Sequence, residues 1–156
     1  MKIKWKGLIL SIAIPLIVGG LAGLISSRGM MAFDELNKPY LSPPGWLFPI
    51  VWTILYILMG LASYIIITSS SDGNKTKTAL KIYGLQLLFN FFWPILFFNL
   101  NLYFFSFLWL IILWLLILIT IVLFYKISKP AAYLMVPYLL WVTFASYLNL
   151  SIALLN

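Results

Sequence analysis

Five apolar runs, each about as long as a lipid bilayer is thick, leave this chain few ways to fold. A helix needs about 20 apolar residues to cross a bilayer, and it satisfies its backbone hydrogen bonds internally. The 156 residues are 64% hydrophobic and only 8% charged, with a mean hydropathy of +1.09. A soluble domain of this size could not wet its surface with that composition. The sequence therefore predicts an integral membrane protein.

The predicted transmembrane helices cover about residues 8–25, 46–68, 79–98, 102–125 and 131–154. Three lysines precede the first run, which is also typical of a cleaved signal peptide. The run is long for a signal peptide, however, and no small-residue cleavage site ends it, so we interpret it as a retained helix. The predicted fold class is an all-α membrane protein, a five-helix bundle in which residues 1–156 form a single transmembrane domain.

Basic residues between the runs predict how the bundle is oriented. The N-terminus, the second loop and the fourth loop carry three, three and two Lys or Arg residues. The first loop carries Arg28 and Lys38, and the third loop and the C-terminus carry none. By the positive-inside rule the N-terminus is cytoplasmic, and the first loop and the C-terminus lie outside. Topology and lipid headgroups thereby account for the net charge of +7, so the bilayer is an expected partner and nucleic acid is not.

The first loop is stiff and leads directly into the second helix. Four prolines between residues 39 and 49 exclude a helix before Trp46, because each ring fixes φ and removes an N–H donor. Beyond them, Trp52 and Tyr56 lie four residues apart and share one helix face. Lipid alone gives no reason for so much rigid aromatic surface at one helix end. The stretch therefore predicts a Pro-rich lid loop over a pocket.

Three helices carry stripes of aromatic and polar side chains at helical spacing. The stripes are Pro49, Trp52, Tyr56, Gly60 and Ser63 on the second helix, Gln86, Asn90, Trp93 and Phe97 on the third, and Tyr138, Trp141, Ala145 and Asn149 on the fifth. An amide is too costly to face lipid, so these stripes are expected to face the interior of the bundle. Pro49, Pro94 and Pro137 predict that all three helices are bent near the stripes.

The chain contains no cysteine and no histidine. A disulfide, a thiolate nucleophile and the usual zinc and haem-iron ligand sets are excluded, so no metal site and no obligatory cofactor are expected. Acidic and basic residues are also missing from the middle of the runs, which argues against transport coupled to ions or protons. No acid–base pair or nucleophile constellation supports conventional catalysis.

Some aromatic residues fit a purely structural role. Trp5, Trp109 and Trp114 have no polar partner at helical spacing, and we interpret them as interface-belt or lipid contacts. Asparagine and glutamine side chains also bond between membrane helices and stabilise them without any ligand.

Small residues leave further alternatives open. Gly60 and Ala145 either make room beside the aromatic rings or allow tight packing, and their spacing does not decide between the two. Gly19 and Gly23 permit close helix approach, for which packing within the chain is preferred to a dimer contact. The third helix offers Gly84 without a small residue four positions on, so the sequence does not settle whether the protein forms a homodimer.

Three groups of motifs resemble one known family. They are Lys38-Pro39, Pro43-Pro44, Trp46, Pro49, Val51-Trp52, Leu55-Tyr56 and Met59-Gly60; then Gln86-Leu87, Asn90, Trp93-Pro94 and Phe97-Phe98; then Pro137-Tyr138-Leu139, Trp141, Phe144-Ala145 and Leu148-Asn149. In this order they are similar to the TspO/MBR family of translocator proteins and tryptophan-rich sensory proteins, related to the peripheral benzodiazepine receptor. The resemblance covers nearly the whole chain. A tryptophan common in the family ahead of the Pro-Pro pair is Leu41 here.

The resemblance implies a five-helix bundle with a pocket near the first loop. Family members bind porphyrins, including protoporphyrin IX, and synthetic benzodiazepine-site drugs, and eukaryotic members also bind cholesterol. Some bacterial members promote light-dependent porphyrin breakdown, and the tryptophans implicated there correspond to Trp52 and Trp141.

Residues and resemblance together predict a protein of the bacterial-type cytoplasmic membrane that binds porphyrins and benzodiazepine-site-type ligands, with a role in tetrapyrrole transport, sensing or regulation. The expected ligand-binding residues are Phe33, Pro44, Trp46, Pro49, Trp52, Tyr56, Gln86, Asn90, Trp93, Phe97, Tyr138, Trp141 and Ala145. Arg28 and Lys38 are expected to contact the ligand's carboxylates. The alternatives are an enzyme that degrades porphyrin under light through Trp52 and Trp141, and a purely structural membrane protein.

Overall fold

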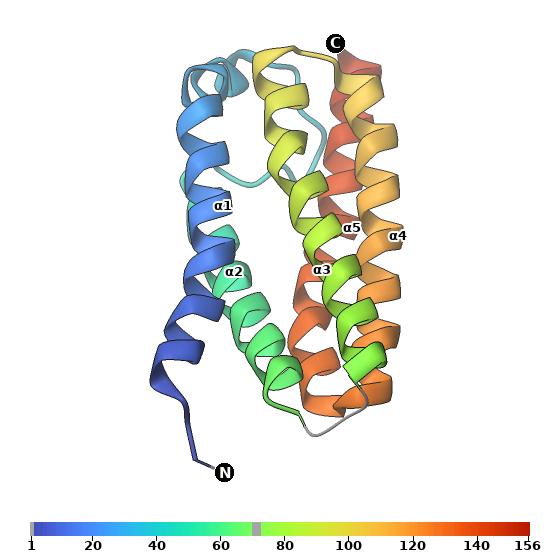
Figure 1. Ribbon diagram of the computed structural model, residues 1–156. Coiled ribbons are helices and arrows are strands. Elements are labelled where there is room, and N and C mark those ends of the chain that lie inside the picture. The colour runs from blue at the N-terminus through green and yellow to red at the C-terminus, as the bar shows by residue number, and fades with distance from the viewer. Residues whose placement is uncertain (1, 70–72) are drawn as a thin grey trace.

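The computed structural model describes residues 2–69 and 73–156 and shows five long helices (Figure 1). They are α1 (Trp5–Met31), α2 (Leu47–Ile67), α3 (Gly73–Pro94), α4 (Tyr103–Ile127) and α5 (Lys129–Leu155). A 3₁₀ turn, η1 (Ala32–Glu35), follows α1, and a π-helical turn, η2 (Ile95–Asn99), follows α3. All five helices are long and apolar enough to cross a membrane. The predicted all-α fold with five transmembrane helices is confirmed.

The first helix extends further than its apolar run. Residues after 25 were expected to form a loop, but α1 continues to Met31. Ser26 Oγ donates to the Ala22 carbonyl at 2.6 Å, and Ser27 Oγ donates to the Leu24 carbonyl at 2.9 Å. Each hydroxyl is thereby satisfied within α1, so the helix accommodates both polar residues.

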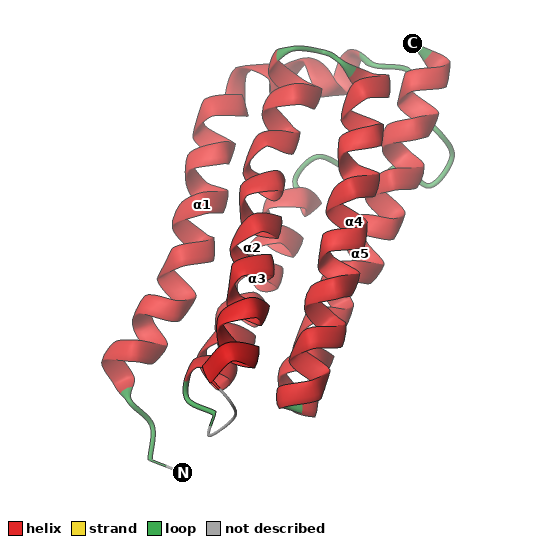
Figure 2. Cartoon of the chain, turned by 45° about the vertical axis from the view of Figure 1, so that its right-hand side comes forward, coloured by secondary structure: helices red, strands yellow, loops and turns green. Residues whose placement is uncertain are grey.

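The helices form a ring in the order α1, α2, α5, α4, α3, and α3 contacts α1 again to close it (Figures 1 and 2). Five crossings place the described N-terminal segment and the C-terminus at opposite ends of the bundle (Figure 1). The connection between η1 and α2, residues 36–46, lies at the end of the bundle that holds the C-terminus. The turns η1 and η2 lie at the same end.

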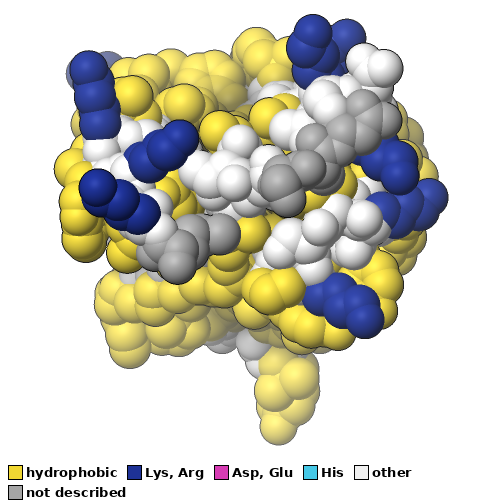
Figure 3. Space-filling view, turned by 60° about the horizontal axis from the view of Figure 1, so that its bottom comes forward, with side chains coloured by type: hydrophobic (Ala, Val, Ile, Leu, Met, Phe, Trp, Pro, Cys, Tyr) yellow, Lys and Arg dark blue, Asp and Glu magenta, His cyan; other side chains and the backbone are white. Residues whose placement is uncertain are grey.

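Lysines gather at the end of the bundle where α1 begins (Figure 3). This end carries eight of the ten basic residues: Lys2, Lys4, Lys6, Lys75, Lys77, Lys81, Lys126 and Lys129. We refer to it as the lysine end, and to the opposite end as the loop end. The interior near the lysine end is tightly packed, and Ile66, Phe124 and Met135 are 0% exposed there.

Glycines set how closely α1 approaches its neighbours. A Cβ at Gly60 on α2 would lie 2.5 Å from the Ile12 Cα on α1, so Gly60 serves tight packing between these helices. A Cβ at Gly19 would overlap the Tyr56 ring, so Gly19 packs within the chain. Gly23, in contrast, faces open space.

The position of Pro49 gives no reason for a bend in α2, although prolines were predicted to bend all three striped helices. Pro49 lies in the first turn of α2, where an N–H group has no partner within the helix, so the ring displaces no hydrogen bond there. Pro94 ends α3 and is followed by η2, while Pro137 lies inside α5.

Trp109 and Trp114, which we interpreted as belt or lipid contacts, are partly buried, and each also donates a hydrogen bond to a neighbouring helix. Trp109 Nε1 donates to the Phe89 carbonyl at 2.8 Å, and Trp114 Nε1 donates to Thr143 Oγ1 at 2.8 Å. Their partners lie on neighbouring helices, which spacing along one helix cannot reveal. Trp5 is 65% exposed on the outer surface of α1.

The first connection is tied to α5 by side-chain hydrogen bonds. The Asn37 backbone N–H donates to Asn156 Oδ1 at 3.2 Å, and Asn156 Nδ2 donates to the Asn37 carbonyl at 2.9 Å. Further along, Tyr147 Oη donates to the Tyr40 carbonyl at 2.8 Å. The connection therefore follows α5 before it enters α2. Its role as a lid stays a prediction.

Candidate functional site

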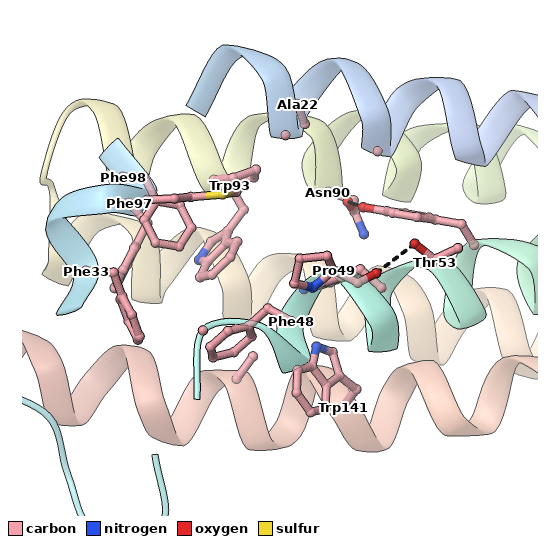
Figure 4. Close-up of a pocket in the computed structure, with 18 of the residues that line it drawn as sticks. Ala22, Phe33, Phe48, Pro49, Thr53, Asn90, Trp93, Phe97, Phe98 and Trp141 are labelled. Carbon is pink, nitrogen blue, oxygen red and sulfur yellow. Dashed lines mark hydrogen bonds between the residues drawn. The ribbon is translucent and has the colours of Figure 1, made fainter. Parts of the chain in front are cut away.

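A cavity of about 450 Å³ lies inside the loop end of the bundle, between α1, α2, α3 and α5 (Figure 4). Its lining comprises Leu16, Gly19, Gly20, Ala22, Gly23, Met30, Phe33, Gly45, Phe48, Pro49, Trp52, Thr53, Tyr56, Asn90, Trp93, Pro94, Phe97, Phe98, Trp141, Ala145, Leu148, Asn149 and Ile152. Ligand pockets of about 300–1,000 Å³ hold drug-sized molecules, so the cavity is large enough for a small organic ligand.

Most of the expected site residues meet in this cavity. Those that line it are Phe33, Pro49, Trp52, Tyr56, Asn90, Trp93, Phe97, Trp141 and Ala145. Pro44 and Trp46 do not, because they lie exposed on the connection before α2, where Trp46 is 67% exposed. Gln86 and Tyr138 do not either, because they are buried one layer behind the lining.

A chain of hydrogen bonds joins that deeper layer to the cavity. Tyr56 Oη donates to Asn90 Oδ1 at 2.8 Å, and Asn90 Nδ2 donates to Tyr138 Oη at 2.7 Å. Tyr138 Oη in turn donates to Gln86 Oε1 at 2.7 Å. Gln86 therefore positions Tyr138 and has no place at the cavity surface. Asn90 is held by two tyrosines and keeps one N–H for a further acceptor.

A second group of hydrogen bonds holds Trp93. Trp93 Nε1 donates to Asn149 Oδ1 at 2.9 Å, and Asn149 Nδ2 donates to the Tyr103 carbonyl at 2.7 Å. Ser106 Oγ also donates to Asn149 Oδ1, at 3.2 Å. The indole of Trp93 is thus locked in orientation, with its only donor already in use.

Trp141 differs from Trp93 in that its indole donor is free. Among the residues that the structure describes, Trp141 Nε1 is buried and has no hydrogen-bond partner. Figure 4 shows this nitrogen on the side of the ring that faces the cavity and Pro49. A buried donor without a partner is costly, so Trp141 offers a favourable position for a ligand oxygen or nitrogen acceptor.

Aromatic rings form much of the remaining wall. Trp52 is stacked on Tyr56 with ring centroids 5.6 Å apart, and Trp93 is stacked on Phe97 at 5.3 Å. Phe48 contacts Trp141 edge to face at 5.9 Å. Paired rings hold each other in place, so the wall presents rigid aromatic surfaces to a flat ligand.

Charge is confined to the rim of the cavity. Among the described residues, no Asp, Glu, Lys or Arg lines it, and no group of three or more His, Cys, Asp or Glu could hold a metal ion. Lys38 Nζ lies 4.7 Å from the centroid of the Phe33 ring and 3.6 Å from Asp34 Oδ1. Arg28 is exposed in the last turn of α1, away from the lining. Lys38 is therefore the cation next to the cavity.

Sequence reasoning missed several residues that line the cavity. Phe48 adjoins the predicted Pro49, and Phe98 adjoins the predicted Phe97. Asn149 was placed on the correct face without being counted in the site. Gly20 and Gly23 also line it, from α1, for which no site residue was predicted. A cluster of glycines in a membrane helix is the signal that could have drawn α1 into the site, because residues without side chains leave room beside the helix.

The chain is similar to one family model and to several known proteins. Residues 11–155 match the model of the TspO/MBR family. The tryptophan-rich protein TspO of Archaeoglobus fulgidus is 36% identical over 151 residues, which cover 96% of each chain. The protein of the same name from Chlorobaculum tepidum is 38% identical, with 80% of this chain and 78% of the relative covered. The human translocator protein is 32% identical, with 80% and 75% covered.

Proposed function

Because the chain belongs to the TspO/MBR family, we propose that it binds a porphyrin, such as protoporphyrin IX, in the cavity at the loop end. The observation that carries the proposal is an indole-lined cavity in which the donor of Trp141 lacks a partner. The proposal extends to other flat apolar ligands of benzodiazepine-site type, because the same stacking surfaces and donor suit them. The proposal includes a role for this binding in tetrapyrrole transport, sensing or regulation.

The uncharged lining favours a ligand that is apolar over most of its surface. Burial of flat rings against Trp52, Trp93 and Phe97 contributes about 25 cal/mol for each Å² of apolar surface removed from water. Metal-free porphyrin fits this donor set better than haem, since the chain contains no histidine or cysteine to ligate iron.

The carboxylates of a porphyrin need cations at one edge of the ring, and Lys38 is placed to supply one. Its ammonium lies against Phe33, which lines the cavity, and is paired with the exposed carboxylate of Asp34. Asp34 is 80% exposed, and an ion pair with a solvated carboxylate contributes little stability, so Lys38 can exchange Asp34 for a ligand carboxylate at little cost. Arg28 is exposed in the last turn of α1 and is the second candidate for this contact.

Binding is tested by titrating the protein in lipid nanodiscs with protoporphyrin IX and following tryptophan fluorescence. We expect saturable quenching. Trp141→Phe, which keeps a ring but removes the donor, should weaken binding by about fivefold to tenfold, as expected for the loss of one hydrogen bond. Trp5→Phe is the matched control, because Trp5 lies outside the cavity.

Two results would contradict the proposal. One is quenching by the wild-type protein that does not saturate, as for a porphyrin dissolved in the lipid alone. The other is equal dissociation constants for the Trp141→Phe and Trp5→Phe variants and the wild type.

Light-driven breakdown of the bound porphyrin is the second candidate function. The observation in its favour is that Trp52 lies in the cavity and is stacked on Tyr56, which places two oxidisable rings in contact beside the ligand position. The test compares porphyrin bleaching under light and air for the wild type, for Trp52→Phe with Trp141→Phe, and for lipid alone. Bleaching that is no faster with the wild type than with lipid alone excludes this function.

The lysine end is proposed to face the cytoplasm, with the cavity near the outer surface. The uneven distribution of basic residues supports this orientation. Because the chain has no cysteine, single cysteines at residue 77 and at residue 40 can report sidedness in intact cells. A membrane-impermeant maleimide should label the cysteine at residue 40 and should not label the cysteine at residue 77. Labelling at residue 77 alone would overturn the proposed orientation.

A further inference from the structure

The wall of the cavity between α1 and α2 is thin. The lining contributed by these two helices includes Gly20 and Gly23 on α1 and Pro49 and Thr53 on α2. A Cβ at either glycine would meet no atom within 4 Å. Gly20, Pro49 and Thr53 are exposed although they line the cavity. These four residues bound what we call the side gap.

The gap exists because α1 is held to different neighbours at its two ends. Near the lysine end α1 packs on α2, with Gly60 against Ile12 and with the Lys4 N–H donating to Tyr64 Oη at 2.8 Å. Near the loop end α1 is held to η2 instead, where Asn99 Nδ2 donates to the Ile25 carbonyl at 3.0 Å. The segment between these attachments passes from α2 towards η2, and its glycines provide no side chains to fill the space.

The side gap lies at the depth of the lipid chains. Gly23 and Gly20 precede the end of α1 at Met31 by eight and eleven residues, which corresponds to about 12 to 16 Å along the helix. The headgroup region is only about 5 to 8 Å thick on each side of the bilayer. The one polar side chain at the gap is satisfied within its own helix, since Thr53 Oγ1 donates to the Pro49 carbonyl at 2.7 Å (Figure 4). The rim of the gap is thus compatible with lipid.

The route past the connection at residues 36–46 is more firmly held. Asn37 and Asn156 are joined by two hydrogen bonds, and Tyr147 holds the Tyr40 carbonyl. These contacts hold the connection against α5 at this end of the bundle. No comparable hydrogen bond joins the two sides of the gap among the residues that the structure describes.

We propose that ligands reach the cavity sideways from the lipid phase, through the side gap between α1 and α2. The inference rests on the proposed binding function and deepens it, because it selects ligands by their partition into the bilayer as well as by their fit. A ligand must then be apolar enough to dissolve among lipid chains and thin enough to pass between two helices. An amphiphilic ring system, with its carboxylates trailing toward the headgroups, meets both requirements.

The test blocks the gap after folding, so that a failure to fold cannot obscure the result. Gly20→Cys and Gly84→Cys each introduce the only thiol of the chain, and each is labelled in nanodiscs with a bulky, lipid-soluble maleimide. Gly84 is the matched control, because it is also an exposed helical glycine with nothing within 4 Å of its Cβ position, but it does not line the cavity. Association and dissociation of protoporphyrin IX, delivered from preloaded vesicles, are followed by stopped-flow tryptophan quenching.

The label at residue 20 should slow both association and dissociation about tenfold, equivalent to about 1.4 kcal/mol of barrier. The label at residue 84 should change neither rate. The double variant Asn37→Ala with Asn156→Ala, which loosens the connection at residues 36–46, should also leave both rates unchanged.

Three results would overturn the inference while leaving the binding function intact. They are unchanged rates with the label at residue 20, a weakened affinity with an unchanged association rate, and exchange that becomes about tenfold faster in the double variant. Absence of saturable quenching in the unlabelled wild type is a different failure. It would remove the proposed binding function, and the inference with it.

Discussion

The two ends of the bundle are built from the same five helices but pack differently. Near the lysine end, branched and aromatic side chains fill the middle of the bundle, and Ile66, Phe124 and Met135 are fully buried. Near the loop end, rigid rings and glycines enclose about 450 Å³. The comparison shows that the kinds of side chain at each end of the bundle determine where a cavity forms. Small residues serve tight packing where a neighbouring backbone is close, as at Gly60, and leave empty space where it is not, as at Gly23.

The largest expected effect comes from adding volume at the lysine end of the contact between α1 and α2. Gly60→Leu would push against the Ile12 backbone, which cannot move aside as a flexible side chain could, so it should destabilise the protein by about 3 kcal/mol. Gly23→Leu enters open space and should cost far less. The measurement is the free energy of unfolding in mixed micelles. Equal losses for the two variants would remove the distinction between a packed end and an open end.

A smaller loss is expected where the two ends meet. Asn90→Ala removes the acceptor of the Tyr56 hydroxyl and one partner of Tyr138 inside the bundle. We expect about 2 kcal/mol lower stability, because a buried hydroxyl without a partner is costly. Ser27→Ala, which removes an exposed hydroxyl bonded to its own helix, is the control. If thermal unfolding shows the same loss for both, the buried hydrogen bonds contribute nothing specific to the cavity wall.

The smallest effect concerns the connection that crosses the loop end. Leu41 has φ at 74°, a left-handed conformation that costs a residue with a side chain about 1–2 kcal/mol. Leu41→Gly relieves this strain but also gives the unfolded chain more conformational freedom, which offsets part of the gain. The net result should be a stabilisation of about 0.5 kcal/mol and a slightly higher melting temperature. The neighbouring Tyr40 has no such conformation, so Tyr40→Gly should lower the melting temperature. Equal losses in both variants would contradict the assignment of strain to Leu41.

Much of this arrangement can be predicted from the sequence, because a bilayer restricts both the length of a helix and the side chains that it can expose. Apolar run length predicts the five helices, and the cost of an amide in lipid directs Asn90 inward, with Trp93 and Phe97 on the same face. Spacing along one helix does not reveal depth, which is why Gln86 and Tyr138 were expected at the cavity and lie behind it.

Other features depend on contacts between helices that no single helix encodes. The hydrogen bonds of Trp109 and Trp114 cross to neighbouring helices, so a pattern within α4 could not show them. The contribution of α1 was missed because Gly20 has no side chain, and a periodic pattern of side chains is what face assignment uses.

The most direct test of the central claim is to fill the cavity and measure porphyrin binding. Ala145 lines the cavity and is 8% exposed, so the ring of Ala145→Phe would occupy ligand space. The measurement is a protoporphyrin IX titration of the wild type and this variant in nanodiscs, with thermal unfolding recorded on the same samples. The account predicts saturable binding by the wild type and binding at least about tenfold weaker in the variant, a loss of about 1.4 kcal/mol, at a closely similar melting temperature. Undiminished saturable binding by a folded Ala145→Phe protein would contradict it.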